Sequence, residues 1–181
     1  MSVRAKMWTR AEYDRLIAAG AFAPDTRVQL VQGEIVEMTP QSRAHAVAVM
    51  AVEEALRDVF QVGYTIQVQM PLALGPTAEP EPDIAVIPGH FREYRDHPTT
   101  AVLVVEVADT SLEFDRSRKA AMYAEAGILE YWILTLVDRR LEVYRDARGP
   151  AYDTRLMLGP EETVSPLAAA DASVRIGSLL P

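Results

Sequence analysis

The spacing of apolar residues divides this chain into helical and strand-like segments. Periodic apolar residues or helix-capping residues predict three helices, at residues 9–20, 42–60 and 115–126. Alternating or short continuous apolar runs between turn residues predict strands at residues 27–38, 64–74, 83–87, 101–108, 129–136 and 139–145. The first of these runs has Gly33 near its centre and is predicted to be a hairpin. Because hairpins are antiparallel and a helical crossover favours parallel neighbours, the order predicts an α/β fold with a mixed sheet.

The run AVLVVEVA at residues 101–108 is apolar on both of its faces. A strand of this kind is expected at the centre of a sheet, covered on both sides. Glu106 is the one charged residue in the run, and its place near the end of a buried strand needs an explanation.

A chain of 181 residues is long enough to bury the core of one domain. We expect a single domain over residues 1–181, with its core at about residues 27–145. Residues 146–181 carry weak strand patterns and four prolines. We interpret them as a C-terminal extension, made of short edge elements or of a tail that contacts a partner.

Composition narrows the classes of function. The formal net charge of −8 disfavours nucleic-acid binding, unless a local basic patch or a bound divalent cation reverses the field at a site. The absence of cysteine excludes a disulfide framework and a thiolate metal site. No uninterrupted apolar run is long enough to span a membrane, and the N-terminal residues lack an apolar signal core. We therefore expect a cytoplasmic protein.

Two carboxylates are predicted to meet at one rim of the sheet. Asp83 opens its strand and Glu106 lies near the end of the next one. If these consecutive strands pair antiparallel, the start of the first lies beside the end of the second. The two charges would repel each other there, and a divalent cation removes that cost. Mg²⁺ is typically held by one or two carboxylates together with water and substrate phosphates.

Lys119 adds a cation to this prediction. It is one of only two lysines among 18 Lys and Arg residues, and it lies three and four residues before Met122 and Tyr123 on one helix face. We expect this helix to begin at about Asp115, which places Lys119 near the positive end of the helix dipole. A cation there suits the binding of a phosphate or the orientation of an anionic nucleophile. Two acids and a lysine around one metal are suited to phosphodiester hydrolysis.

The residues that carry this chemistry also carry a family resemblance. EPDIAVI (81–87), followed by LVVEVADTSLEFDRSRKAAMYAEAGILEYWIL (103–134), resembles the restriction endonucleases of the Uma-two family, within the PD-(D/E)xK nuclease superfamily. The resemblance extends roughly from VQLVQGEIVEM to LEVYR, and its specific part is residues 104–134. The pair PD alone has almost no weight as a motif.

The resemblance implies a restriction-endonuclease-like αβββαβ core and a Mg²⁺-dependent site in which Mn²⁺ can substitute. Asp83, Glu106 and the backbone carbonyl of Val107 would be the metal ligands. The chain departs from the superfamily pattern at Ala108, which occupies the usual lysine position, and Lys119 on the following helix would replace that lysine. DNA is the implied substrate, and a homodimer is expected because double-strand cleavage by this superfamily usually needs two sites.

Other residues are weaker candidates. Glu34 and His45 match positions that recur in the family: Glu34 as a further ligand or a water-orienting carboxylate, and His45 as a contact to substrate or to a ligand. Arg116 and Arg118 form a small basic cluster, which would contact phosphate or simply be solvated. Asp115 is interpreted as a helix-capping acid. The aromatic residues of the helix and of the following strand are interpreted as core packing, namely Tyr123, Tyr131 and Trp132.

Two alternatives to an endonuclease remain compatible with these residues. A catalytically silent domain could keep the nuclease fold and act as a binding or assembly module, which the acidic composition favours. The same acids and lysine would equally support metal-assisted hydrolysis of a smaller phosphoester.

Overall fold

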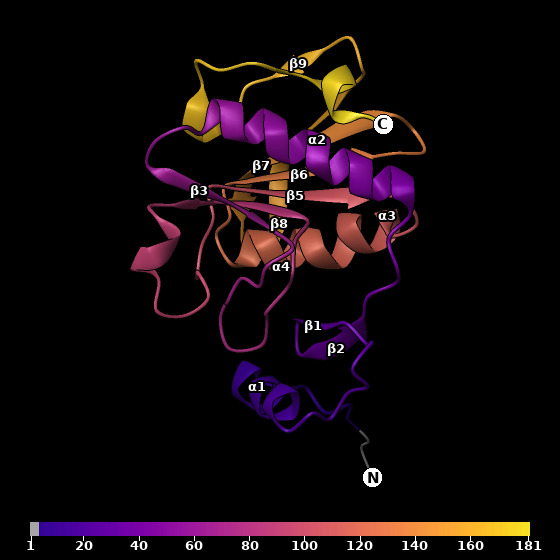
Figure 1. The fold of residues 1–181 in the computed structure, drawn as a ribbon, viewed down its shortest axis with the longest axis vertical. Coiled ribbons are helices and arrows are strands. Elements are labelled where there is room, and N and C mark those ends of the chain that lie inside the picture. Colours follow the sequence, from indigo (N-terminus) through magenta and orange to yellow (C-terminus); the bar gives the residue numbers. More distant parts are fainter. Residues whose placement is uncertain (1–3) are drawn as a thin grey trace.

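A mixed six-stranded sheet forms the centre of the protein, in the order β3-β4-β5-β6-β7-β8 (Figure 1). The structure is a computed structural model and describes residues 4–181. The strands, in the same order, are Tyr64–Val68, Ile84–Pro88, Leu103–Ala108, Glu130–Thr135, Arg140–Arg148 and Ala151–Leu158. β5 and β6 are parallel, and each other neighbouring pair is antiparallel. The predicted α/β fold with a mixed sheet is confirmed.

Helices cover both faces of the sheet (Figure 1). Helix α2 (Arg43–Val59) lies on one face. The crossover from β5 to β6 lies on the other and consists of α3 (Leu112–Phe114), a π-helical turn (Asp115–Lys119) and α4 (Ala120–Glu125). No helix within residues 4–181 has the length and apolar character required to cross a membrane.

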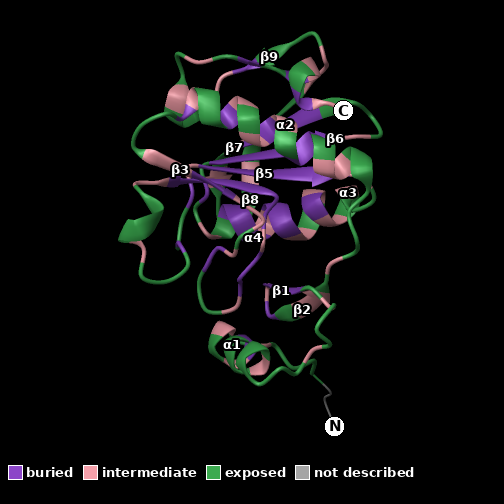
Figure 2. Ribbon diagram, viewed as in Figure 1, coloured by how far each residue is buried: buried purple, intermediate pink, exposed green. Residues whose placement is uncertain are grey.

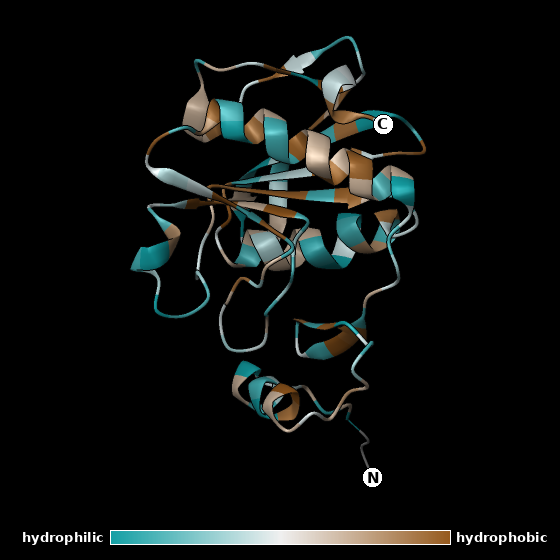
Figure 3. Ribbon diagram, viewed as in Figure 1, coloured by the Kyte–Doolittle hydropathy of each residue, from teal (hydrophilic) through white to brown (hydrophobic). Residues whose placement is uncertain are grey.

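The alternation of side chains along β5 produces two hydrophobic cores. Leu103, Val105 and Val107 belong to the core beneath α2, whereas Val104 and Ala108 belong to the core beneath α4. Figure 2 shows the resulting buried layer, and Figure 3 shows that it is rich in hydrophobic residues. β5 is therefore the central, doubly covered strand that its sequence predicts.

The N-terminal residues form a smaller unit beside the α4 face. Helix α1 (Arg10–Ala18) begins with the predicted capping box, in which Thr9 and Glu12 bond each other's backbone N–H groups. The hairpin is made of β1 (Val28–Val31) and β2 (Glu34–Glu37). Its Leu30 exchanges two backbone hydrogen bonds with Glu79, which fixes the hairpin to the loop between β3 and β4.

Two predicted elements have different limits in the structure. The strand predicted over residues 64–74 ends at Val68, because Gln69 adopts a left-handed φ of 51° and Pro71 lacks a backbone N–H. The crossover helix begins at Leu112 rather than at about Asp115. Asp115 is therefore an internal helical residue and not a capping acid.

The C-terminal residues are packed into the domain. β8 extends the sheet beyond β7, and the short strands β9 (Thr163–Val164) and β10 (Val174–Arg175) form a small second ladder. Two 3₁₀ turns complete this region, Leu167–Ala169 and Ile176–Leu179. Four of its side chains join the core beneath α2, namely Val164, Val174, Ile176 and Leu179. The packed core therefore extends beyond residue 145.

Candidate active site

The antiparallel pairing of β4 and β5 brings Asp83 to the end of β5. Ile84 pairs with Val105, and the Val107 N–H donates a hydrogen bond of 2.9 Å to Asp83 Oδ2. Gln69 holds the other oxygen, because its side-chain N–H group donates to Asp83 Oδ1 at 3.1 Å. The expectation that the start of the first strand lies beside the end of the second is confirmed.

His45 completes the surroundings of Asp83. It lies in the first turn of α2, where the Ser42 hydroxyl caps the helix by accepting the His45 backbone N–H. Its Nε2 atom lies 3.2 Å from Asp83 Oδ2. Burial acts to lower the pKa of His45, but Asp83 and the Val107 backbone raise it above its ordinary value. His45 therefore contacts a candidate ligand rather than open solvent.

Glu106 is held by two donors on one of its oxygens. Lys119 Nζ lies 2.8 Å from Glu106 Oε1, and the Tyr123 hydroxyl donates to the same oxygen at 2.7 Å. Only 3% of Glu106 and 6% of Lys119 are exposed. The lysine on the crossover helix therefore reaches the carboxylate at the end of β5.

The crossover helix presents two charged groups, Asp115 and Lys119, to the interior, because residues four apart lie on one helix face. Asp115 and Lys119 bracket the π-helical turn and are both buried, with Asp115 Oδ1 at 3.6 Å from Lys119 Nζ. The Ser111 hydroxyl donates to Asp115 Oδ2, whereas Oδ1 is buried and has no hydrogen-bond partner among residues 4–181. Wide π turns occur frequently at functional sites.

The two strand-end carboxyl groups have opposite pKa shifts. Burial raises the pKa of Glu106 to about 7, although the Lys119 charge acts in the other direction. Burial also acts to raise the pKa of Asp83, but the hydrogen bond and charge of His45 and the Val107 N–H lower it below its ordinary value. Titratable pairs whose surroundings separate their pKa values are typical of active sites.

The two carboxylates and the lysine line one cleft. It has a volume of about 300 Å³ and lies among the hairpin β1–β2, the start of α2 and the π-helical turn. His45, Val107 and Asp115 also line it. The fold thus brings five of the residues predicted to form the site into one cleft, namely His45, Asp83, Glu106, Val107 and Lys119.

The remaining candidates lie outside this cleft. Glu34 is exposed and forms an ion pair of 2.6 Å with Arg118, which links the hairpin to the crossover helix. Arg116 is directed to the sheet, where its guanidinium binds the fully buried Glu142.

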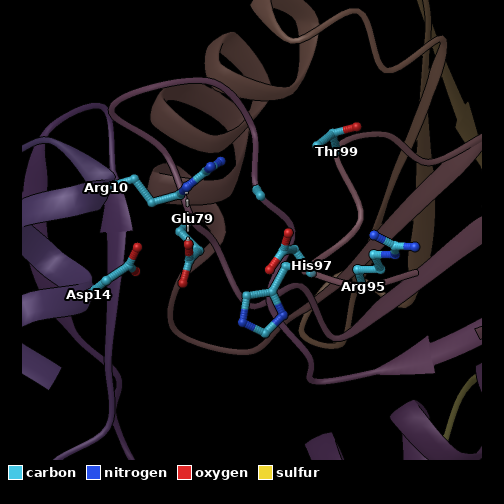
Figure 4. Close-up of a pocket in the computed structure, with 8 residues that line it drawn as sticks. Arg10, Asp14, Glu79, Arg95, His97 and Thr99 are labelled. Carbon is cyan, nitrogen blue, oxygen red and sulfur yellow. Dashed lines mark ion pairs between the residues drawn. The ribbon is translucent and has the colours of Figure 1, made fainter. Parts of the chain in front are cut away.

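A larger polar cavity of about 630 Å³ lies between α1 and the loops before β4 and before β5 (Figure 4). Glu79 is the buried acid in it, and Arg10 Nε lies 3.6 Å from its carboxylate. The residues predicted to carry chemistry do not line this cavity. We therefore place the candidate active site in the smaller cleft.

The donor set of the cleft is compatible with a hydrated divalent cation. Among residues 4–181, Glu106 Oε2 accepts no hydrogen bond, and Asp83 Oδ1 accepts one. A group of three or more acidic or histidine ligands does not occur within residues 4–181. Mg²⁺ does not require such a group, because it commonly keeps several waters and binds one or two carboxylates.

Sequence reasoning missed the parts played by Asp115, Tyr123 and Gln69. The first two lie four residues before and four residues after Lys119, so the helical repeat already places them on its face. No sequence pattern indicated a role for Gln69, because its contact with Asp83 depends on the left-handed backbone that ends β3.

Comparison with known proteins agrees with this architecture. Residues 10–176 match the profile of the family described as "Uma2: Putative restriction endonuclease". The fold is similar to the crystal structure of a putative nuclease belonging to DUF820 from Anabaena variabilis ATCC 29413. The TM-score is 0.69 and the sequence identity is 15%, over 94% of this chain and 96% of that chain. None of the curated proteins matches the chain. Because the profile covers nearly the whole chain, the protein belongs to the Uma2 family of restriction-endonuclease-like proteins.

Proposed function

We propose that the protein is a Mg²⁺-dependent endonuclease that hydrolyses phosphodiester bonds of DNA. The observation that carries this proposal is the convergence of Asp83, Glu106 and Lys119 in one cleft at the end of β5. Membership of the Uma2 family supports the nuclease class.

Asp83 and Glu106 would hold the divalent cation, with the Val107 carbonyl as a third ligand and Mn²⁺ as a substitute for Mg²⁺. When bound, such a cation makes the phosphorus more electrophilic and favours deprotonation of a nucleophilic water. His45, Gln69 and the Val107 N–H orient Asp83 through the contacts described above. Glu34 is not proposed as a ligand, because it is exposed and paired with Arg118.

Lys119 would act on the reacting groups as a hydrogen-bond donor. Its pKa lies above the ordinary value, because the charges of Glu106 and Asp115 outweigh the effect of burial, so it is an ammonium ion. As an ammonium ion it can orient the attacking water or stabilise the charge on the phosphate in the transition state. In the reaction the water oxygen bonds to phosphorus, one P–O ester bond breaks, and the departing oxygen gains a proton.

Several properties of the enzyme are part of the proposal. Double-strand cleavage by the PD-(D/E)xK superfamily usually needs two sites, which a homodimer would supply, and we propose a cytoplasmic location. Arg118 is the better candidate for a phosphate contact, since its ion-pair partner Glu34 is exposed, whereas Arg116 is engaged with buried Glu142. Light scattering after size-exclusion chromatography measures the oligomeric state.

The proposal is tested with purified protein, supercoiled plasmid and short duplex DNA in Mg²⁺ or Mn²⁺. We expect cleavage by the wild type, no cleavage with EDTA, and loss of cleavage in Asp83→Asn and Lys119→Met. Lys6→Met is the matched control, because Lys6 is the other lysine and is exposed. Cleavage that survives both substitutions in the cleft would overturn the assignment.

The acidic composition favours one alternative, a nuclease-fold module that binds or assembles without catalysis. Thermal unfolding with and without Mn²⁺ separates the two functions, because a ligand that binds only the folded state raises the unfolding temperature. A rise that is lost in Glu106→Gln supports the endonuclease. Identical curves with and without Mn²⁺ support the module.

A further inference from the structure

Tyr123 is a fully buried residue whose hydroxyl is directed at the candidate active site. It packs in the core beneath α4, and its hydroxyl donates to Glu106 Oε1 at 2.7 Å. Lys119 Nζ lies 2.8 Å from that same oxygen. The two donors therefore converge on one oxygen of a carboxylate that is itself buried.

The packing of Tyr123 leaves its hydroxyl little freedom. Its ring contacts the ring of Tyr131, with centroids 5.0 Å apart, and both residues are fully buried. The Tyr131 hydroxyl is engaged elsewhere, because it donates to the Asp115 carbonyl at 3.2 Å. The hydrogen bond to Glu106 is thus imposed by the core and not by a mobile surface side chain.

The consequence for Glu106 is a fixed division between its two oxygens. Oε1 receives Lys119 and Tyr123, whereas Oε2 accepts no hydrogen bond from residues 4–181. Without Tyr123, Lys119 alone would hold the carboxylate, and a single flexible donor permits rotation of the group. With both donors in place, Oε1 stays bonded to Lys119, and Oε2 stays available to bind a cation.

We propose that Tyr123 is a positioning residue that orients Glu106, so that Oε1 stays on Lys119 and Oε2 is presented to a divalent cation in the cleft. This inference rests on the proposed function, because it assigns Tyr123 a part in building the same site. It replaces the interpretation of Tyr123 as core packing alone. Groups that orient a metal ligand through a hydrogen bond typically contribute 10- to 100-fold to metal affinity.

Tyr123→Phe is the substitution that separates the two interpretations. Phenylalanine keeps the ring and its packing and removes only the hydroxyl. Tyr152→Phe is the matched control, because the Tyr152 hydroxyl also makes one hydrogen bond, to the Ile128 carbonyl at 2.8 Å, and does not contact Glu106. Thermal unfolding of both variants establishes that each is folded.

The experiment is titration calorimetry of the full chain with Mn²⁺ in the absence of DNA. We expect the dissociation constant of Tyr123→Phe to be about 10-fold weaker than that of the wild type, and that of Tyr152→Phe to be unchanged. Equal constants for the wild type and Tyr123→Phe would overturn this inference and leave the proposed function intact. A wild type that binds no Mn²⁺ would overturn both.

A second measurement does not depend on the variant being folded. In crystals of the wild type soaked with Mn²⁺, we expect Glu106 to contact the cation through Oε2 while Oε1 keeps its bonds to Tyr123 and Lys119. A cation bound through Oε1, with the Tyr123 hydroxyl released, would contradict the proposed role.

Discussion

Lys119 Nζ lies 2.8 Å from Glu106 Oε1, and both groups are buried. Between the two residues the chain forms the end of β5, a short loop, α3 and the π-helical turn. A buried carboxylate at the end of a central strand would be costly without a partner. Lys119 supplies that partner, so one contact serves both the stability of the fold and the charge of the candidate active site.

Removing the lysine should therefore destabilise the protein. We expect Lys119→Met to lower the free energy of unfolding by about 3 kcal/mol at pH 8, because it leaves a buried carboxylate without its cation. Lys6→Met should change it by less than about 1 kcal/mol, because Lys6 and Glu12 form an exposed pair. Urea denaturation measures both. Equal effects of the two substitutions would contradict the burial of Lys119.

The two arginines of the π-helical turn should differ in their contributions to stability. Arg116 and Arg155 neutralise Glu142, which is fully buried, and the Tyr144 hydroxyl also donates to it. We expect Arg116→Ala to cost about 2 kcal/mol, the scale of a hydrogen bond to a charged group.

Arg118→Ala should cost less than about 1 kcal/mol, because both partners of the Arg118–Glu34 pair are partly exposed. The same urea denaturation curves measure the difference. A larger loss of stability in Arg118→Ala than in Arg116→Ala would show that Glu142 does not anchor the crossover helix.

Glu79 should make stability depend on pH. Burial and the nearby Asp14 raise the pKa of Glu79 above its ordinary value. Because the folded state then favours the protonated form more than the unfolded state does, stability falls as the pH rises from the unfolded pKa through the folded one. We expect Glu79→Gln to raise the unfolding temperature at pH 8 and to change it little at pH 4.

Glu54→Gln is the control for Glu79, since Glu54 lies on the exposed face of α2. Thermal unfolding monitored by circular dichroism, at several pH values between 4 and 8 (about one unit apart), gives the comparison. The same pH profile for the wild type and Glu79→Gln would refute the assignment of this dependence to Glu79.

The C-terminal residues should contribute to the core. Ile176 is fully buried beneath α2, and we expect Ile176→Ala to cost about 3 kcal/mol. Leu167 is 49% exposed, and Leu167→Ala should change stability by less than about 0.5 kcal/mol. Urea denaturation measures the free energy of unfolding of both variants. A negligible effect of Ile176→Ala would mean that this region does not fold onto α2 in solution.

Local sequence patterns predicted most of the helices and strands. The spacing of apolar residues and the positions of turn residues depend on residues only a few positions apart, so they can be read directly from the sequence. The capping box at Thr9 and the apolar run around Glu106 are of this kind. The end of β3 was missed because no local pattern marked the left-handed backbone of Gln69, whose side chain bonds the distant Asp83. β8 was predicted only as weak, short edge elements and not as one long strand, because an exposed edge strand does not require an apolar face.

The site was predictable as far as it depends on strand pairing and helical spacing. Asp83 and Glu106 follow from antiparallel pairing, and Lys119 follows from its place on an apolar helix face. Asp115 was misread as a cap because the helix begins three residues earlier than its capping pattern indicated. Tyr123 was assigned to packing because a tyrosine in an apolar stripe has the same spacing whether or not its hydroxyl has a polar partner.

The position of a bound cation decides whether Asp83 and Glu106 form a metal site. Anomalous diffraction from wild-type crystals soaked in Mn²⁺ locates that cation without reference to any substrate. We predict one site bonded to the carboxylates of Asp83 and Glu106, beside the Lys119 ammonium. A saturating soak that leaves this cleft without an anomalous peak, or that places Mn²⁺ only elsewhere, would contradict this prediction.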